Sequence, residues 1–274
     1  MIKIKEIKVK SIIVKSNLPE GDFVINPYIG CVHGCKYCYA RFMKRFTGHT
    51  EAWGSFVDVK INAPDLISTN TEKYKDKSIT IGSATDPYQT IERGYKLTRQ
   101  ILEKLIPLQP HLVDIMTKSD LVLRDINLIK QLKNCIIVLS LSILDEKIRK
   151  ELEPLSSSAD KRINTLKELH KAKIPTALFI SPIFPELTNW KHLINKTKIF
   201  VDEYWFENLN LYPSIKNNIY NLLRKNKPEL IEKYQKIYSK NSNYWGNEEK
   251  KIKEFCKKNK INYRIYFHHK RKGG

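Results

Sequence analysis

Asn26-Pro-Tyr-Ile-Gly-Cys-Val-His-Gly-Cys-Lys-Tyr-Cys-Tyr-Ala-Arg41 is the stretch on which the rest of this chain depends. It contains three of the five cysteines, Cys31, Cys35 and Cys38, spaced Cys-x3-Cys-x2-Cys. Three thiolates at this spacing on a short loop can bind three corners of a four-iron cluster and leave the fourth iron without a protein ligand. The stretch therefore predicts an iron–sulfur site at which one iron is open to a reactant.

A structural zinc site is the main alternative for this loop. Zinc sites of that kind take four ligands, and His33 lies inside the loop at an awkward spacing for tetrahedral closure. Gly30 and Gly34 bracket the first two cysteines and permit a tight turn around a bulky inorganic group. The other thiols, Cys135 and Cys256, are predicted to pack in the core, as buried free cysteines usually do.

The overall charge points to polyanions as partners. The 274 residues include 49 Lys and Arg against 29 Asp and Glu, a formal net charge of +20, which favours binding to nucleic acid. A coding sequence rich in Lys, Ile and Asn is the other explanation for this composition. No apolar run approaches the ~20 residues that cross a bilayer, and the N-terminal residues 1–8 lack the uninterrupted apolar core of a signal peptide. With an odd number of cysteines and no disulfide framework, we expect a cytoplasmic protein without a membrane partner.

From residue 79 onward the sequence alternates short apolar strands with amphipathic helices. This alternation predicts a parallel sheet of the α/β class. Six strands suit a partial barrel better than a closed barrel of eight. The predicted strands are residues 23–25, 79–82, 112–116, 135–143, 176–180 and 198–201, and the predicted helices between them are 95–105, 121–132 and 162–172. Asp125 is predicted to be a solvated residue on the surface of the second helix.

The ends of the chain differ from this repeat. Residues 1–20 alternate apolar residues with lysines and are predicted to form an edge strand or a bulged hairpin. The barrel is assigned to residues 21–205 and a basic, mostly helical extension to residues 206–274. Residues 201–274 hold 17 Lys and Arg against 8 Asp and Glu. The predicted elements of the extension are helices at 215–223, 228–238 and 248–258, followed by a strand at 261–267.

Polar residues follow the predicted strands at one rim of the sheet. In open α/β sheets, the chemistry gathers at the carboxyl ends of the strands. The rim residues are Ser83 to Gln89 after the second strand, Thr117 to Ser119 after the third, Ser140 and Ser142 in the fourth, and Ser181 to Pro185 after the fifth. The sequence therefore predicts that these residues surround the cysteine loop.

These motifs together resemble a known family. The Cys-x3-Cys-x2-Cys loop with an aromatic residue before its third cysteine resembles the radical S-adenosylmethionine (radical SAM) superfamily. The similarity is closer to its spore photoproduct lyase-like branch, often labelled DNA repair photolyase. It rests on residues 26–41, on Thr85-Asp-Pro-Tyr-Gln89, on Thr117-Lys-Ser119, and on Leu152-Glu-Pro154 followed by Arg162.

The resemblance implies a partial (β/α)6 barrel that holds a [4Fe-4S] cluster and S-adenosyl-L-methionine (AdoMet). It implies reductive cleavage of AdoMet to a 5′-deoxyadenosyl radical, which takes hydrogen from a substrate. By position, Cys31, Cys35 and Cys38 are implied to be the iron ligands. The residues implied to contact AdoMet are Tyr37, Ser83, Thr85, Asp86, Lys118, Ser140 and Ser142.

One departure from the branch concerns the closing step. Spore photoproduct lyase uses a cysteine near the rim of the second strand as hydrogen donor, and here that stretch reads Ser83-Ala-Thr-Asp. A serine hydroxyl is a poor donor of a hydrogen atom. Tyr37 and Tyr39 form a tyrosine pair that is the candidate catalytic relay. The closing step is therefore predicted to differ from that of the lyase.

The sequence is thus interpreted as a radical SAM enzyme acting on nucleic acid, with an electron donor such as flavodoxin or ferredoxin as a further partner. Two alternatives are a radical SAM enzyme that modifies a peptide or protein, and a non-catalytic iron–sulfur protein that binds nucleic acid or senses redox state. The oligomeric state is left open. Residues 204–206 either line the substrate mouth or seal the barrel. Residues 268–272, His-His-Lys-Arg-Lys, are either a mobile tail or a phosphate-binding run.

Overall fold

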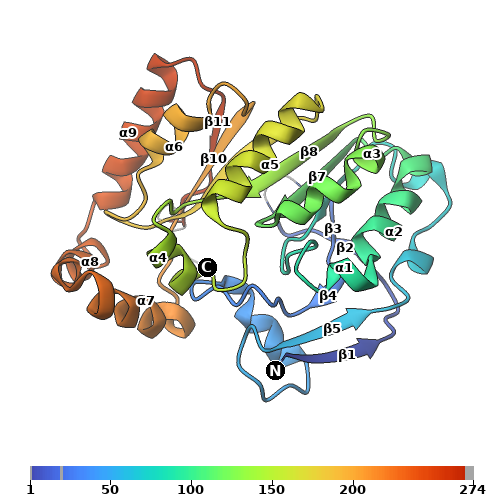
Figure 1. The fold of residues 1–274 in the computed structure, drawn as a ribbon, viewed down its shortest axis with the longest axis horizontal. Helices are drawn as coiled ribbons and strands as arrows, with labels where there is room; N and C mark the ends of the chain where they lie inside the picture. Colours follow the sequence, from blue (N-terminus) through green and yellow to red (C-terminus); the bar gives the residue numbers. More distant parts are fainter. Residues whose placement is uncertain (1, 19–20, 269–274) are drawn as a thin grey trace.

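The computed structural model describes residues 2–18 and 21–268. Its main feature is a sheet of eight strands in the order β11-β10-β9-β8-β7-β6-β3-β2 (Figure 1). All neighbours in this sheet are parallel except β2 and β3. The strands of the sheet are β2 (Ile13–Lys15), β3 (Phe23–Ile25), β6 (Ser78–Ile81), β7 (Leu112–Thr117), β8 (Cys135–Ser140), β9 (Thr176–Ile183), β10 (Glu203–Asn208) and β11 (Tyr263–Ile265). The predicted α/β fold with a partial barrel is confirmed.

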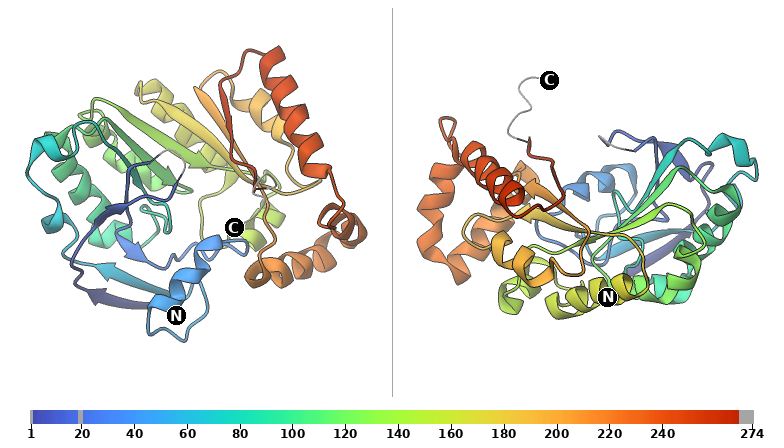
Figure 2. Two further views of the ribbon diagram at one scale, coloured as in Figure 1. Left: turned by 180° about the vertical axis from the view of Figure 1, so that it is seen from behind. Right: turned by 90° about the horizontal axis from the view of Figure 1, so that it is seen from above.

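Helices cover one face of this sheet. Figure 1 shows α2, α3 and α5 lying across β6 to β9, and Figure 2 shows the same layer from behind and from above. The α-helices are α1 (Glu92–Tyr95), α2 (Leu97–Leu105), α3 (Ile126–Ile129), α4 (Glu146–Leu152), α5 (Ala159–Lys171), α6 (Trp190–Thr197), α7 (Pro213–Asn226), α8 (Ile231–Ile237) and α9 (Tyr244–Lys258). Short 3-10 helices are η1 (Tyr39–Phe46), η2 (Pro64–Leu66), η3 (Thr71–Lys73), η4 (Ile106–Leu108), η5 (Asp120–Asp125) and η6 (Pro228–Leu230).

Side-chain alternation along the strands separates two apolar regions. Val113 and Ile115 of β7 belong to the large core beneath the helices, whereas Met116 packs with a smaller cluster around Val138 and Phe179 on the other face. This division follows from the period of two along a strand. The inner face therefore carries its own aromatic packing, in which the rings of Phe179 and Trp205 lie 5.9 Å apart.

A second, three-stranded sheet holds the beginning of the chain. Its order is β1-β5-β4, with β1 (Lys3–Ile7) parallel to β5 (Phe56–Lys60) and β4 (Tyr28–Ile29) antiparallel to it. The N-terminal segment thus supplies an edge strand to each sheet, β1 to the small one and β2 to the large one. It does not fold back on itself as a hairpin, because its two halves pair with different partners.

The predicted sixth strand at 198–201 is wrong. This apolar run follows the end of α6, and Ile199 is 80% exposed. The strand is instead β10, whose alternating aromatic residues Tyr204 and Phe206 are buried. Aromatic side chains favour strands, whereas Phe200 and Val201 of the shorter run enter the core from a turn after α6. Residues 204–206 are therefore part of the sheet.

Two expectations about residues 121–132 are also wrong. The segment is not one helix but η5 followed by the four-residue α3. Asp125 is not solvated, because its carboxylate is fully buried and accepts hydrogen bonds from Arg99 at 2.9 Å and Arg124 at 2.7 Å. A buried carboxylate needs such partners.

The C-terminal residues contribute to the sheet as well as to a helical layer. Helices α7, α8 and α9 correspond to the three predicted helices of the extension, and β11 pairs in parallel with β10 at the edge of the sheet. The boundary predicted between residues 205 and 206 falls inside β10. Of the basic run 268–272, only His268 lies within the described residues. Among the residues that the structure describes, no helix has the length and apolar character needed to span a membrane.

Candidate active site

The cysteine loop lies between β4 and η1, close to the carboxyl ends of the parallel strands. Cys31 and Cys35 are buried, and all three thiols of the loop are free rather than disulfide-bonded. Two successive turns shape the loop, with the Gly34 N–H donating to the Cys31 carbonyl at 3.3 Å and the Cys38 N–H to the Cys35 carbonyl at 3.2 Å. Burial, Asp86 and the other two thiols raise the pKa of Cys31. The loop thus holds three thiols in a low-dielectric environment.

Gly30 and Gly34 have the backbone conformations that were expected of glycine. Gly30 has φ +88°, and a Cβ there would lie 2.5 Å from the Phe56 carbonyl oxygen. Gly34 has φ +60° and lies against Gly54. A Cβ added to Gly54 would lie 2.7 Å from the Gly34 Cα. A side chain is excluded by contact at Gly30 and Gly54 and is disfavoured by backbone strain at Gly34. The loop can therefore pack backbone to backbone against the segment before β5.

Residues after β6 hold the first half of the loop. Gln89 accepts a hydrogen bond from the Val32 N–H at 2.8 Å and donates to Thr85 Oγ1 at 3.0 Å. Thr85 in turn donates to the Gly30 carbonyl at 2.6 Å. Both side chains are buried. Thr85 and Gln89 therefore fix the backbone around Cys31.

Asp86 links the loop to the end of β7. Its carboxylate accepts hydrogen bonds from Thr117 Oγ1 and the Lys118 N–H, both at 2.7 Å, and lies 3.3 Å from His33 Nδ1. Burial alone would raise the pKa of Asp86, but His33 and these donors lower it to about 2. Both oxygens are therefore engaged by the protein itself.

A buried charged network holds the second half of the loop. The Lys36 N–H donates to the Leu152 carbonyl at 2.8 Å, and the Tyr37 hydroxyl donates to Glu153. Arg162, which has no exposed surface, donates to Glu153 and to the Ser140 carbonyl, the latter at 2.9 Å. Although burial opposes ionisation, Arg162 and Lys118 lower the pKa of Glu153 to about 2. Tyr37 is thereby fixed between two cysteines.

The two candidate tyrosines lie in different environments. Tyr37 is 9% exposed, and its ring packs edge-on against Phe184 at 5.3 Å. Tyr39 is 49% exposed, and its hydroxyl donates to the Ser83 carbonyl at the end of β6. Ser83 Oγ accepts a hydrogen bond from the Asn26 side chain at 3.0 Å. The rim position that lacks a thiol is therefore occupied by Ser83 with Tyr39 directly beside it.

Lys118, Ser140 and Ser142 lie on the same rim. Lys118 is half-buried, with its Nζ 5.9 Å from the centre of the Tyr37 ring. Burial alone would lower the pKa of Lys118, but Cys35 and Glu153 outweigh it and the pKa is raised. Ser140 is buried beside Arg162, and the buried Ser142 Oγ has no hydrogen-bond partner among the described residues. Lys118 and Ser142 thus offer polar groups that the protein leaves available.

Comparison with known proteins identifies the family. Residues 25–195, more than half of the chain, match the sequence model of the radical SAM superfamily. The chain belongs to this superfamily. Its members are enzymes that use a [4Fe-4S] cluster and AdoMet. This radical SAM protein is therefore an enzyme, and its predicted family and cofactors are confirmed.

Curated relatives cover much of the same region. An uncharacterized protein of Methanocaldococcus jannaschii is 43% identical over 231 residues, which are 84% of this chain and 86% of the relative. An uncharacterized protein of Acidianus two-tailed virus is 30% identical over 181 residues, which are 63% of this chain and 59% of the viral protein.

Solved structures share the fold at low identity. Spore photoproduct lyase complexed with dinucleoside spore photoproduct aligns with a TM-score of 0.71 and 15% identity over 96% of this chain and 82% of the lyase. Streptococcus suis SuiB bound to S-adenosylmethionine aligns with a TM-score of 0.55 and 13% identity over 89% of this chain and 49% of SuiB. At these identities the likeness concerns the fold alone.

The residues present fit the cofactors of the family. Two buried donors, Arg41 Nε and Trp53 Nε1, form no hydrogen bond within the described residues. Burial raises the pKa of Cys38, while Lys118, Arg41 and Trp53 lower it, which places these groups near its sulfur. Sulfide and thiolate are acceptors that such donors suit. Across residues 2–18 and 21–268, no three metal-binding side chains form a coordination group for a single metal ion.

Several site residues were not predicted as such. Gln89, Glu153 and Arg162 were seen only as parts of motifs, without a role. A further group lies where β9 to β11 end: Glu207 accepts a hydrogen bond from Ser181 Oγ and lies 2.9 Å from His268 Nε2. The acidic character of residues 203–210 was visible in the sequence, but the pairing of Glu207 with His268 required the register of β11.

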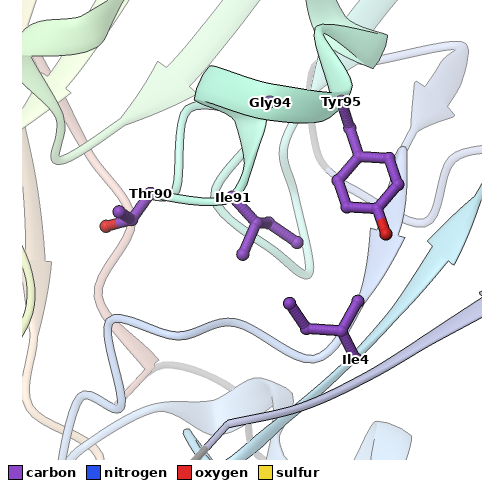
Figure 3. Close-up of a pocket in the computed structure, with 5 residues that line it drawn as sticks. All are labelled: Ile4, Thr90, Ile91, Gly94 and Tyr95. Carbon is purple, nitrogen blue, oxygen red and sulfur yellow. The ribbon is translucent and has the colours of Figure 1, made fainter.

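One surface pocket borders the site, because His33 of the cysteine loop and Ser119 of the rim line it. A second pocket, of about 510 Å³, lies between β1 and α1 and is lined by Ile4, Thr90, Ile91, Gly94 and Tyr95 (Figure 3). None of these is a predicted site residue. The site is therefore defined by the cysteine loop and the rim rather than by this hollow.

Proposed function

We propose that this radical SAM enzyme cleaves AdoMet at a [4Fe-4S] cluster held by Cys31, Cys35 and Cys38 and takes a hydrogen atom from a nucleic acid. The observation that carries the proposal is the cysteine loop, anchored on both halves by buried residues and placed beside unpaired polar groups at the sheet rim. One electron from a reductant such as flavodoxin or ferredoxin gives methionine and a 5′-deoxyadenosyl radical, which becomes 5′-deoxyadenosine on taking hydrogen.

The chain's own residues divide into two groups in this proposal. The first group contacts AdoMet and comprises Tyr37, Ser83, Lys118, Ser140 and Ser142. Lys118 is the cation for the AdoMet carboxylate. Thr85 and Asp86 act differently from the initial interpretation. Their polar atoms are taken up by Gly30, Gln89, Thr117 and Lys118, so we assign them to hold the loop.

Tyr39 is the proposed relay for the closing step. Its ring is exposed next to Ser83, whereas the Tyr37 hydroxyl is committed to Glu153. A phenol in this position can pass a hydrogen atom to a substrate radical, which a serine hydroxyl does poorly. Tyr39 is therefore assigned as the relay, and Tyr37 remains a contact of AdoMet.

Charge and fold support nucleic acid as the substrate. The net charge of +20 gives non-specific affinity for phosphates through counterion release. Spore photoproduct lyase, whose structure shares this fold, was solved with a dinucleoside photoproduct. SuiB, solved with a precursor peptide, aligns with the lower TM-score of 0.53. A polynucleotide is therefore preferred to a peptide.

The test is anaerobic reconstitution of the full chain with iron and sulfide, followed by dithionite and AdoMet. The expected result is formation of 5′-deoxyadenosine that Cys38→Ala abolishes, together with loss of bound iron. Cys135→Ala, a thiol packed beneath the helices, is the control and should retain both.

The substrate class is tested in the same assay with DNA, RNA and peptide pools. Stimulation of 5′-deoxyadenosine formation by a polynucleotide, together with binding that weakens steeply with salt, supports the proposal. Stimulation by peptides alone, or binding to polynucleotides that is weak and insensitive to salt, would overturn the nucleic-acid assignment.

A further inference from the structure

The helix that follows the third cysteine exposes an aromatic face. We define the η1 aromatic face as Tyr39, Phe42 and Phe46, which are 49%, 43% and 64% exposed. Tyr39 and Phe42 lie 6.4 Å apart between ring centres. Exposed apolar rings gathered on one short helix mark an interaction surface rather than a packing surface. Nothing in the proposed cluster or AdoMet contacts uses Phe42 or Phe46.

The same helix is basic. Its sequence, Tyr-Ala-Arg-Phe-Met-Lys-Arg-Phe, holds three cations and no acid. The Arg45 guanidinium lies 4.7 Å from the centre of the Phe46 ring and 5.5 Å from that of Phe42. Aromatic rings interleaved with cations are the combination that binds bases by stacking and phosphates by charge. The face therefore matches a polyanion with flat apolar groups.

The η1 aromatic face begins at the mouth of the barrel. Tyr39 follows Cys38 directly and is bonded to the Ser83 carbonyl. In Figure 1, η1 is the blue helical segment between β5 and α7.

Resting on the nucleic-acid substrate proposed above, we propose that the η1 aromatic face stacks unpaired bases next to the target nucleotide. The rings of Phe42 and Phe46 are accessible only to bases that have left the duplex stack, because paired bases present their edges rather than their faces. The target is thus in a single strand or flipped out of a duplex. Arg45 then lies beside the phosphates that join the stacked bases.

An acidic redox protein is the other occupant that such a face could attract. Tyr39 is bonded to the Ser83 carbonyl at the sheet rim beside the cysteine loop, so a protein bound there would compete with the substrate for the proposed site. A flexible strand can occupy the opening and the helix at the same time. The position of Tyr39 therefore favours nucleic acid.

The experiment measures binding of the reconstituted full chain to a fluorescein-labelled single-stranded oligonucleotide of about 15 nucleotides, a length suited to stacking surfaces. A second oligonucleotide carries 2-aminopurine, whose fluorescence falls when it stacks. Phe42→Ala/Phe46→Ala should weaken single-strand binding by about tenfold or more and remove the quenching, since base stacking on aromatic rings supplies much of such binding. The single variant Phe46→Tyr, which keeps both aromatic rings, should retain most of the binding and most of the quenching.

Ile199→Ala is the matched control, because Ile199 is exposed and remote in sequence from the site. It should bind both oligonucleotides as the native chain does. Unchanged thermal unfolding of the double variant confirms that it is folded, as expected for exposed rings.

The outcomes separate this proposal from the proposed function. If the native chain binds single strands in a salt-dependent manner and the double variant binds them equally well, the stacking face is overturned and the nucleic-acid function stands. If the native chain binds neither single strands nor duplex, the nucleic-acid function itself fails. If the double variant keeps oligonucleotide binding but is reduced more slowly by flavodoxin, the face belongs to the electron donor and our proposal is wrong.

Discussion

The cysteine loop and η1 are adjacent in the chain but are built on opposite principles. Tyr37 is 9% exposed and its hydroxyl is tied to Glu153, whereas Tyr39, two residues later, is 49% exposed. The loop up to Cys38 is bonded to residues after β6 and after α4. In η1 the exposed rings of Phe42 and Phe46 instead contact Arg45 of the same helix.

This difference suits two tasks. A cluster and AdoMet have one geometry, so the groups that bind them gain from being fixed before binding. A nucleic acid of varied sequence needs a surface that accepts any base, and stacking on aromatic rings meets that need. Under the proposed function, the transition at Cys38 therefore separates a rigid cofactor site from a permissive substrate surface.

The largest expected effect comes from breaking the buried anchor of the loop. Arg162→Ala leaves the Glu153 carboxylate buried without its main partner. Removing one member of a buried ion pair costs about 3–5 kcal/mol of unfolding free energy. Urea unfolding at neutral pH measures the change. Iron content after reconstitution should fall as well, because Tyr37 loses its fixed position.

Lys161→Ala is the control for this variant. Lys161 precedes Arg162, but its Nζ is mostly exposed and lies 3.5 Å from Asp120. Exposed pairs contribute at most about 1 kcal/mol. If Arg162→Ala lost no more unfolding free energy than Lys161→Ala, the network would not anchor the loop.

The second effect concerns Asp114, a buried carboxyl whose pKa is raised, in contrast to Glu153, whose pKa is lowered by Arg162 and Lys118. On the inner face of β7, burial raises the pKa of Asp114 to about 6, against the opposing hydrogen bond with Thr80, and Cys135 and Tyr266 lie nearby. A raised pKa means that the neutral carboxyl favours the folded state. Its contribution is complete below about pH 4 and is lost as pH rises through about 6.

Asp114→Asn removes this titration. The difference in unfolding free energy between the variant and the native chain should rise by about 3 kcal/mol from pH 4 to pH 7.5. The rise follows from the pKa of Asp114, which is about 6 in the folded chain and about 4 in the unfolded chain. Urea unfolding at both pH values measures the difference. An equal difference between variant and native chain at both pH values would contradict the assigned pKa.

The sequence predicted the local features of the fold. The parallel sheet and the rim positions of Ser83, Lys118 and Ser142 follow from short motifs and from the rule that parallel strands end at one rim. These features depend on residues close together in the chain.

Features that depend on distant pairing were missed. Glu153 could not be assigned to Tyr37, because the two are 116 residues apart and only the fold brings them together. The sequence predicts a solvated Asp125, because its partner Arg99 lies on α2 and is brought close only by the fold. The run at 198–201 looked more strand-like than residues 203–208, since apolarity alone does not show which run the core receives.

The smallest of these effects compares two glycines on either side of the transition. Gly30 lies in the cysteine loop with φ +88°, and an added Cβ would meet the Phe56 carbonyl at 2.5 Å. Gly48 follows η1, and a Cβ there would have no atom within 4 Å. Gly30→Ala should cost about 1–3 kcal/mol through backbone strain, whereas Gly48→Ala should cost nothing, because alanine narrows the unfolded ensemble. Thermal unfolding together with bound iron measures both variants. Equal losses would mean that the loop is no more constrained than the segment after η1, and the contrast between a fixed cofactor site and a permissive surface would have to be abandoned.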